Sequence, residues 1–253
     1  MLTFQDESIS VATPCINKLL ATLPAADYQR LQSHLTFTPL TVKQVLHKEG
    51  QPIRDIYFPS RGACSLTKTM QDGQTAEVAT IGSEGVIGAG VFFGDDLSAG
   101  DTFVQGSGCS AYRLSTSDFM AEMDRRGPFF NVIIRYTQAL LNQVMQTTVC
   151  NGLHSAEQRC CRWLLMTRDR MGTNDLKLTH EFLSIMLGVR RPTVTLVVHQ
   201  LQQAGLVDTG RSYLRIVNLA GLEAKSCECY GMVKRNFHRL MPEIAAVFEV
   251  GQV

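Results

Sequence analysis

Apolar residues recur at helical spacing in the last third of the chain, where they predict a short helix. Leu183, Met186 and Leu187 stand at positions i, i+3 and i+4, so they share one face. Thr179 suits the N-cap, because its hydroxyl accepts hydrogen bonds from unpaired backbone N–H groups. Gly188 suits the C-terminal end, because glycine readily adopts the left-handed conformation found there.

A second helix is predicted to begin at Pro192, because proline has a helical φ angle and the first helical N–H needs no partner. Its buried face would hold Val194, Val197, Val198 and Leu201. A helix in the major groove reads bases with its first turn and the residues before it, where Arg190 and Arg191 stand. Because an arginine fork matches the O6 and N7 atoms of guanine, the pair predicts a helix-turn-helix for double-stranded DNA.

A β-wing is predicted after Gly205, with its turn at residues 208–210 and strand-like runs on either side. Threonine and arginine side chains can bond phosphate, and a leucine can contact a thymine methyl group. The predicted DNA contacts are Thr179, His180, Arg190, Arg191, Thr193, Thr195, Leu196, His199, Arg211 and Arg215. The alternative is an ordinary helical hairpin with a solvated basic rim.

The N-terminal half changes from helical to strand character near Leu35. An apolar stripe before that point, formed by Cys15, Ile16, Leu19 and Leu20, predicts a helix, and a second short helix starts at Pro24. The short alternating runs that follow are separated by turn residues, which is typical of a β-sandwich or barrel. Asp72-Gly73 predicts a hairpin between two of these strands.

Two helices are predicted between the strands and the helix-turn-helix. Ser117 would cap a short one over residues 118–126, and Pro128 would begin a longer one that runs to about Asn151. The apolar residues of the longer helix exceed one face: Ile133, Ile134, Leu140, Leu141, Val144 and Met145. This helix could pair with its twin in a dimer, or it could be buried against its own barrel.

The C-terminal half is the more basic one. Residues 1–152 hold 11 Lys and Arg against 14 Asp and Glu, whereas residues 153–253 hold 13 against 9, and the net charge is +1. A positive excess beside the helix-turn-helix is what phosphate binding needs. An amphipathic helix over residues 155–171 leads into this region, and a final helix is predicted over residues 219–240.

No apolar run approaches the roughly 20 residues of a membrane span, and no secretory signal is visible, so a cytoplasmic protein without membrane contact is expected. The eight cysteines are scattered, which favours free buried thiols. Cys227 and Cys229 are the one pair separated by a single residue. A metal site would need more ligands nearby, and His238 is the only candidate in that tail, so no metal is expected. Asp95, Asp96 and Asp101 could hold a divalent cation, although a solvated turn is the simpler interpretation.

The order of strands, long helix and winged helix resembles the Crp/Fnr family of bacterial transcription regulators. The resemblance covers nearly the whole chain and is most specific in the motif L-T-x-x-x-L-x-x-x-L-G-V-x-R over residues 178–191. It implies an α+β fold of three parts. These are N-terminal helices with a cyclic-nucleotide-binding-type β-barrel (1–127), a dimerisation helix (128–152), and a winged helix-turn-helix domain with a C-terminal helix (153–253). The resemblance also implies that Arg191 reads guanine and that Thr193 contacts phosphate.

Departures from the family pattern change two expectations. Pro192 and Leu196 stand where the best-known member has a glutamate and a second arginine, so we expect a different half-site. The nucleotide cassette is degenerate, because Ala89 replaces its glutamate and Gly100-Asp101 its arginine pair. The expected effector pocket (Gly88, Ala89, Gly100, Asp101 and Thr102) offers no cation, and its aspartates repel phosphate. We therefore expect no cyclic AMP, and no cofactor.

The residues that hold a sensory cofactor in other branches of the family are not evident in this sequence. An iron–sulfur cluster needs several N-terminal cysteines, and only Cys15 is there. His34 and His47 could ligate haem, but a lone histidine is more often structural.

We therefore expect a homodimeric regulator that binds an inverted repeat, with RNA polymerase as a further candidate partner. A sensory or scaffold module acting through an unidentified effector or protein contacts is the alternative. An enzyme is not expected, because no Ser/His/Asp grouping, metal motif or phosphate loop is found.

Overall fold

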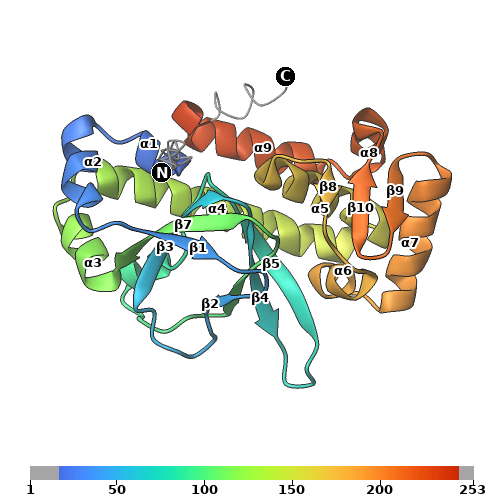
Figure 1. Ribbon diagram of the computed structural model, residues 1–253, viewed down its shortest axis with the longest axis horizontal. Helices are drawn as coiled ribbons and strands as arrows, with labels where there is room; N and C mark the ends of the chain where they lie inside the picture. The colour runs from blue at the N-terminus through green and yellow to red at the C-terminus, as the bar shows by residue number, and fades with distance from the viewer. Residues whose placement is uncertain (1–16, 245–253) are drawn as a thin grey trace, which may run out of the picture.

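The computed structural model describes residues 17–244, and the chain folds into two parts joined by one long helix (Figure 1). Cys15 and Ile16 of the predicted apolar stripe lie outside the described residues. The stripe continues in Leu19 and Leu20, which are buried in the hydrophobic core of the N-terminal part, called the first core below. They belong to the first of two short helices, α1 (Lys18–Ala21) and α2 (Ala25–Gln32).

The N-terminal part holds two antiparallel sheets around a common core. One has the order β1-β7-β3 and the other β2-β6-β4-β5. The strands are β1 (Thr36–Leu40), β2 (Val45–His47), β3 (Asp55–Arg61), β4 (Cys64–Thr69), β5 (Thr75–Ile81), β6 (Asp101–Val104) and β7 (Cys109–Ser115), with a 3-10 helix, η1 (Ala89–Phe93), before β6. Ile56 and Phe58 of one sheet and Val104 of the other share this core. The predicted hairpin at Asp72-Gly73 is confirmed as the β4–β5 connection, where Gly73 has a φ of 84°.

Two helices follow the sheets, α3 (Thr116–Asp124) and α4 (Pro128–Leu153). The predicted cap of α3 at Ser117 is wrong by two residues. The hydroxyl of Ser115 accepts from the backbone N–H of Asp118, so the helix begins directly at the end of β7. Pro128 begins α4 as predicted, and α4 runs behind the sheets toward the C-terminal part (Figure 1).

The C-terminal part is a helical domain with a small sheet of order β8-β10-β9. Its elements are α5 (Ala156–Met171), β8 (Asp175–Leu176), α6 (His180–Leu187), α7 (Arg191–Gln203), β9 (Val207–Gly210), β10 (Tyr213–Ile216), α8 (Leu219–Lys225) and α9 (Cys229–Leu240). The predicted turn at residues 208–210 is wrong, because those residues belong to β9. The wing turns at Arg211 and Ser212 instead, and Ser212 has a φ of 67°.

The single final helix predicted over residues 219–240 is also wrong. Two helices, α8 and α9, occupy it, because Ser226 is extended and Cys227 is buried against Cys150 of α4. The break lets α9 turn back along α4 (Figure 1), where Phe237 and Leu240 pack against the first core. No helix among the described residues is long and apolar enough to cross a membrane.

Candidate DNA interface and effector domain

The predicted helix-turn-helix is formed by α6 and α7. Thr179 caps α6 through the backbone N–H of Phe182, at 3.1 Å, and Gly188 ends it with a φ of 59°. Pro192 lies in the first turn of α7, and the four aliphatic residues predicted for its inner face are all buried. The local signals therefore fix both helices.

The outer face of α7 carries the side chains predicted to contact DNA. Arg190 and Arg191 are exposed at its N-terminal end, and neither has an anionic partner among the described residues. Cations at the positive end of a helix dipole are unfavourable, so the arrangement favours an incoming anion. Leu196 is 58% exposed, which leaves an apolar side chain in water on the face that would enter a groove. Thr195 and His199 are also exposed there, and Thr193 is partly buried.

A cleft of about 420 Å³ lies between this helix pair and the wing. Thr179, His180 and Arg191 line one side, and Gly210 and Ser212 of the wing line the other. A ring nitrogen of His180, Nδ1, stands 3.1 Å from the hydroxyl of Thr195, which in turn donates to the carbonyl of Arg191. The fold thus places the helix cations and the wing along one surface.

The two wing arginines differ in their surroundings. Arg211 lies at the exposed tip and has no polar partner among the described residues. The guanidinium of Arg215 instead bonds the carboxylate of Asp175 at 2.5 Å, and this bond raises its pKa above the ordinary value. Because Asp175 belongs to the neighbouring strand β8, the pairing follows from sheet register, and it weakens Arg215 as a phosphate ligand.

The degenerate cassette lies around η1 and the start of β6. Gly88 has a φ of 92°, and a Cβ there would stand 2.6 Å from the His47 ring, so glycine is required. At Gly100 a Cβ would stand 2.4 Å from the carbonyl oxygen of Thr67. Ala89 and Thr102 are buried, and Asp101 accepts a bond from the backbone N–H of Glu49. These positions form strand contacts and turns, and none brings a cation.

The expectation that no cation lies near this loop is wrong. Lys68 of the neighbouring strand β4 donates to the carbonyl of Ala99 at 2.7 Å and pairs with Glu49 at 2.5 Å. The sequence could not show this contact, because Lys68 lies 31 residues before Ala99. The ammonium is already bound by protein oxygens, so a phosphate would have to replace them.

His47 serves the barrel itself. It is buried, its Nε2 N–H donates to the carbonyl of Asp55 at 2.7 Å, and burial lowers its pKa below the ordinary value. The ring is therefore neutral at physiological pH and holds β2 against β3.

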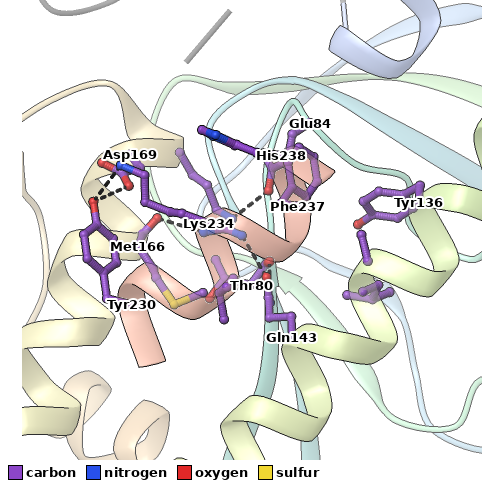
Figure 2. Close-up of a pocket in the computed structure, with 14 residues that line it drawn as sticks. Thr80, Glu84, Tyr136, Gln143, Met166, Asp169, Tyr230, Lys234, Phe237 and His238 are labelled. Carbon is purple, nitrogen blue, oxygen red and sulfur yellow. Dashed lines mark hydrogen bonds and ion pairs between the residues drawn. The ribbon is translucent and has the colours of Figure 1, made fainter. Parts of the chain in front are cut away.

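A narrow cavity of about 50 Å³ lies where α4, α5 and α9 meet (Figure 2). It has room for a few water molecules rather than a nucleotide. Tyr230 of α9 donates to Asp169 of α5 at 2.8 Å, and Lys234 donates to the Tyr230 hydroxyl at 3.4 Å. His238 lines this cavity and does not belong to the group of possible metal ligands that contains Cys227 and Cys229.

The DNA-binding domain rests against the strands of its own chain. The indole N–H of Trp163 on α5 donates to buried Glu77 of β5 at 2.6 Å. Phe182 of α6 meets both Trp163 and Phe103 edge to face. A buried ion pair at 2.8 Å joins Arg170 of α5 to Glu84. The first helix of the helix-turn-helix is therefore anchored, while the outer face of α7 is left exposed.

One group of possible metal ligands was not predicted from the sequence. Cys150 and His154 at the end of α4 lie beside Cys227 and Cys229, with their ligand atoms all within 4.8 Å of one another. It is the one group of this kind found among the described residues, and the three loop aspartates are not in it. The spacing C-x-x-x-H over residues 150–154 was the available signal, since residues four apart at the end of a helix lie about one turn from each other.

Comparisons with known proteins match both parts of the chain. Residues 39–126 match the family model of the cyclic nucleotide-binding domain, and residues 158–225 match that of the Crp-like helix-turn-helix domain. No curated protein matches the sequence.

Solved structures with this fold come from several bacteria. A protein assigned to the Crp/Fnr family of transcriptional regulators, from Eubacterium rectale, is 18% identical with a TM-score of 0.65, over 81% of this chain and 96% of that one. FixK2 from Bradyrhizobium japonicum is 17% identical with a TM-score of 0.65, over 76% and 98%. The c-di-GMP responsive global regulator CLP from Xanthomonas campestris is 16% identical with a TM-score of 0.62, over 76% and 99%.

The two matched domains, in this order and in this shared fold, define a DNA-binding regulator of two domains. The two matched models support a transcription regulator of the Crp/Fnr type. The alternative, a sensory or scaffold module of the same fold that acts through an unidentified effector or protein contacts, is not favoured. Transcription regulators of this type are generally not enzymes.

Proposed function

We propose that the protein binds an inverted DNA repeat as a homodimer, with α7 of each chain in the major groove of one half-site. The observation that carries this proposal is the exposed N-terminal end of α7. Arg190 and Arg191 project there without an anionic partner among the described residues, beside the wing tip at Arg211. In this arrangement the helix can meet bases while the wing meets the phosphate backbone.

The apolar surface of α4 supports the homodimer. Val132, Ile133 and Tyr136 are buried in the chain's own core, which fits one of the two roles foreseen for this helix. A different face carries four exposed apolar residues at a spacing of four: Leu141, Met145, Val149 and Leu153. Residues four apart share a helix face, so these side chains form a continuous stripe. A second copy of α4 would cover it.

Binding of mixed-sequence duplex DNA at increasing salt tests the DNA contact. Each phosphate neutralised by a cation releases counterions, so the logarithm of the binding constant should fall linearly with that of the salt concentration. We expect a slope of several units, measured by fluorescence anisotropy. A slope near zero, with weak binding at all salt concentrations, would support protein contacts instead.

We also propose that cyclic AMP does not control the protein. The cassette supports this, because Ala89 and Gly100-Asp101 leave no glutamate or arginine for a cyclic nucleotide, and Lys68 is already paired. Calorimetry with the full-length protein should detect no cyclic-AMP binding at physiological concentrations, and DNA affinity should not change. Micromolar binding would overturn this part of the proposal and leave the DNA-binding part untouched.

A further inference from the structure

The C-terminal end of α4 and the connection between α8 and α9 bring three cysteines and a histidine together. Cys150 lies in the last turn of α4, and His154 is the C-cap residue that follows the helix, with its backbone N–H donating to the carbonyl of Cys150. Cys227 lies in the α8–α9 connection, and Cys229 is the first residue of α9. Two segments about 75 residues apart in sequence thus meet at one point.

The spacing of the ligand atoms resembles a tetrahedral metal site. The sulfurs of Cys150 and Cys227 lie 3.5 Å apart, and Nδ1 of His154 lies 3.5 Å from the sulfur of Cys229. A tetrahedron with Zn–S bonds of about 2.3 Å has edges of roughly 3.7 Å. All four atoms lie within 4.8 Å of one another, so no separation needs to shorten by more than roughly 1 Å to match.

The surroundings support ligation further. The second ring nitrogen of His154, Nε2, faces a carboxylate oxygen of Glu228 at 3.3 Å. Metal-bound histidines characteristically donate their other N–H to a carboxylate, which fixes the ring and its tautomer. The side-chain amide of Gln146 donates to the sulfur of Cys229 at 3.0 Å, as a donor to a metal thiolate does. All three cysteines are buried, and the His154 side chain is 14% exposed.

We propose that Cys150, His154, Cys227 and Cys229 bind one Zn²⁺ ion in a closed tetrahedral site. Three thiolates and an imidazole are a known structural zinc ligand set, and with four protein ligands no coordination position is left for substrate. The ion would join the end of α4 to the start of α9. It would therefore clamp the long helix to the C-terminal domain and restrain the orientation of the DNA-binding helices.

Metal analysis of the full-length protein, purified under reducing conditions without added metal, is the direct test. We expect about one equivalent of zinc per chain. The double variant Cys227→Ser, Cys229→Ser should lose it. Cys64→Ala, which removes a buried thiol of β4, is the matched control and should keep it. Glu228→Gln should keep the ion with an affinity lower by roughly 10–100-fold.

A cobalt titration of the wild-type apoprotein needs no variant and so does not depend on variant folding. Co²⁺ should give the visible absorption of a tetrahedral thiolate site, saturating near one equivalent, and Zn²⁺ should abolish it. Zinc should also raise the thermal unfolding temperature of the apoprotein.

Two results would overturn the site. One is reduced wild-type protein that binds neither ion. The other is zinc content that is unchanged in the double variant. A Cys150–Cys227 disulfide together with no metal binding after reduction would assign the pair to redox chemistry instead.

Discussion

Among single residues, Arg191 is the one on which the proposed reading of bases depends most. We expect Arg191→Ala to lose about 1–3 kcal/mol of base discrimination per half-site, because a bidentate bond to guanine is worth that much. Affinity for the preferred site should fall and the preference at one base pair per half-site should relax. Binding isotherms on that site and on a scrambled duplex measure both effects. An equal loss of affinity for both duplexes would show that Arg191 contacts phosphate rather than a base.

The matched control for this change is Arg211→Ala at the wing tip, another exposed arginine without a polar partner among the described residues. This substitution should weaken binding to every sequence and lower the salt slope by roughly one unit for each phosphate that is no longer neutralised. Substitution of Arg215 should lower the affinity for DNA less, because its guanidinium is already bound to Asp175.

Buried Glu77 makes stability depend on pH. Burial raises its pKa above the ordinary value, although Trp163 and Thr80 donate to its carboxylate. The folded state therefore binds this proton more tightly than the unfolded state, so stability is lost as pH rises through the folded pKa.

Glu77→Gln should remove this dependence. The side-chain carbonyl oxygen of Gln105 is buried and has no partner among the described residues, while the amide nitrogen of the same side chain donates to Glu77. Rotation of the Gln105 amide would let its oxygen accept from the side-chain N–H that the substitution introduces. We expect the free energy of unfolding of the variant, relative to wild type, to increase from pH 5 to pH 8 in urea titrations. A difference that stays constant with pH would contradict the raised pKa.

At the element scale, local signals predicted most helix ends and strand turns. Thr179, Gly188 and Pro192 act through neighbouring backbone groups, so their roles are visible in the sequence. The errors share a different cause. The wing turn moved to Arg211 and Ser212 because pairing with β10 extends β9 through Gly210. The predicted final helix is broken because Cys227 packs against α4. In both cases a tertiary contact decided the boundary.

The exposed stripe on α4 gives the element-scale prediction. Met145, which is 59% exposed, would be buried in the proposed dimer, so Met145→Glu would bring two charges into an apolar seam. We expect the dimer dissociation constant to rise by roughly 100-fold or more, about 2.8 kcal/mol at 1.4 kcal/mol per tenfold. Sedimentation equilibrium measures it, and Met145→Leu should leave it nearly unchanged. A dimer unaffected by the glutamate would place the interface elsewhere.

At the scale of the whole molecule, the sequence predicted the domain order but not the contacts between domains. The pairings of Trp163 with Glu77 and of Arg170 with Glu84 each join two residues that are 86 positions apart and belong to different parts of the chain, so no local pattern signals them. The same holds for Lys68 beside the cassette and for the cluster at Cys150. Long-range contacts decide which groups meet, and sequence spacing indicates only which groups are available.

The proposed function requires two copies of α7 to read one inverted repeat. Selection of bound sites from a pool of random duplex DNA by the full-length protein tests it most directly. We predict an enriched inverted repeat with guanines in each half-site, whose centres lie one helical turn, about 34–36 Å, apart. A single unrepeated half-site, bound tightly by a monomer, or no enrichment at all, would contradict it.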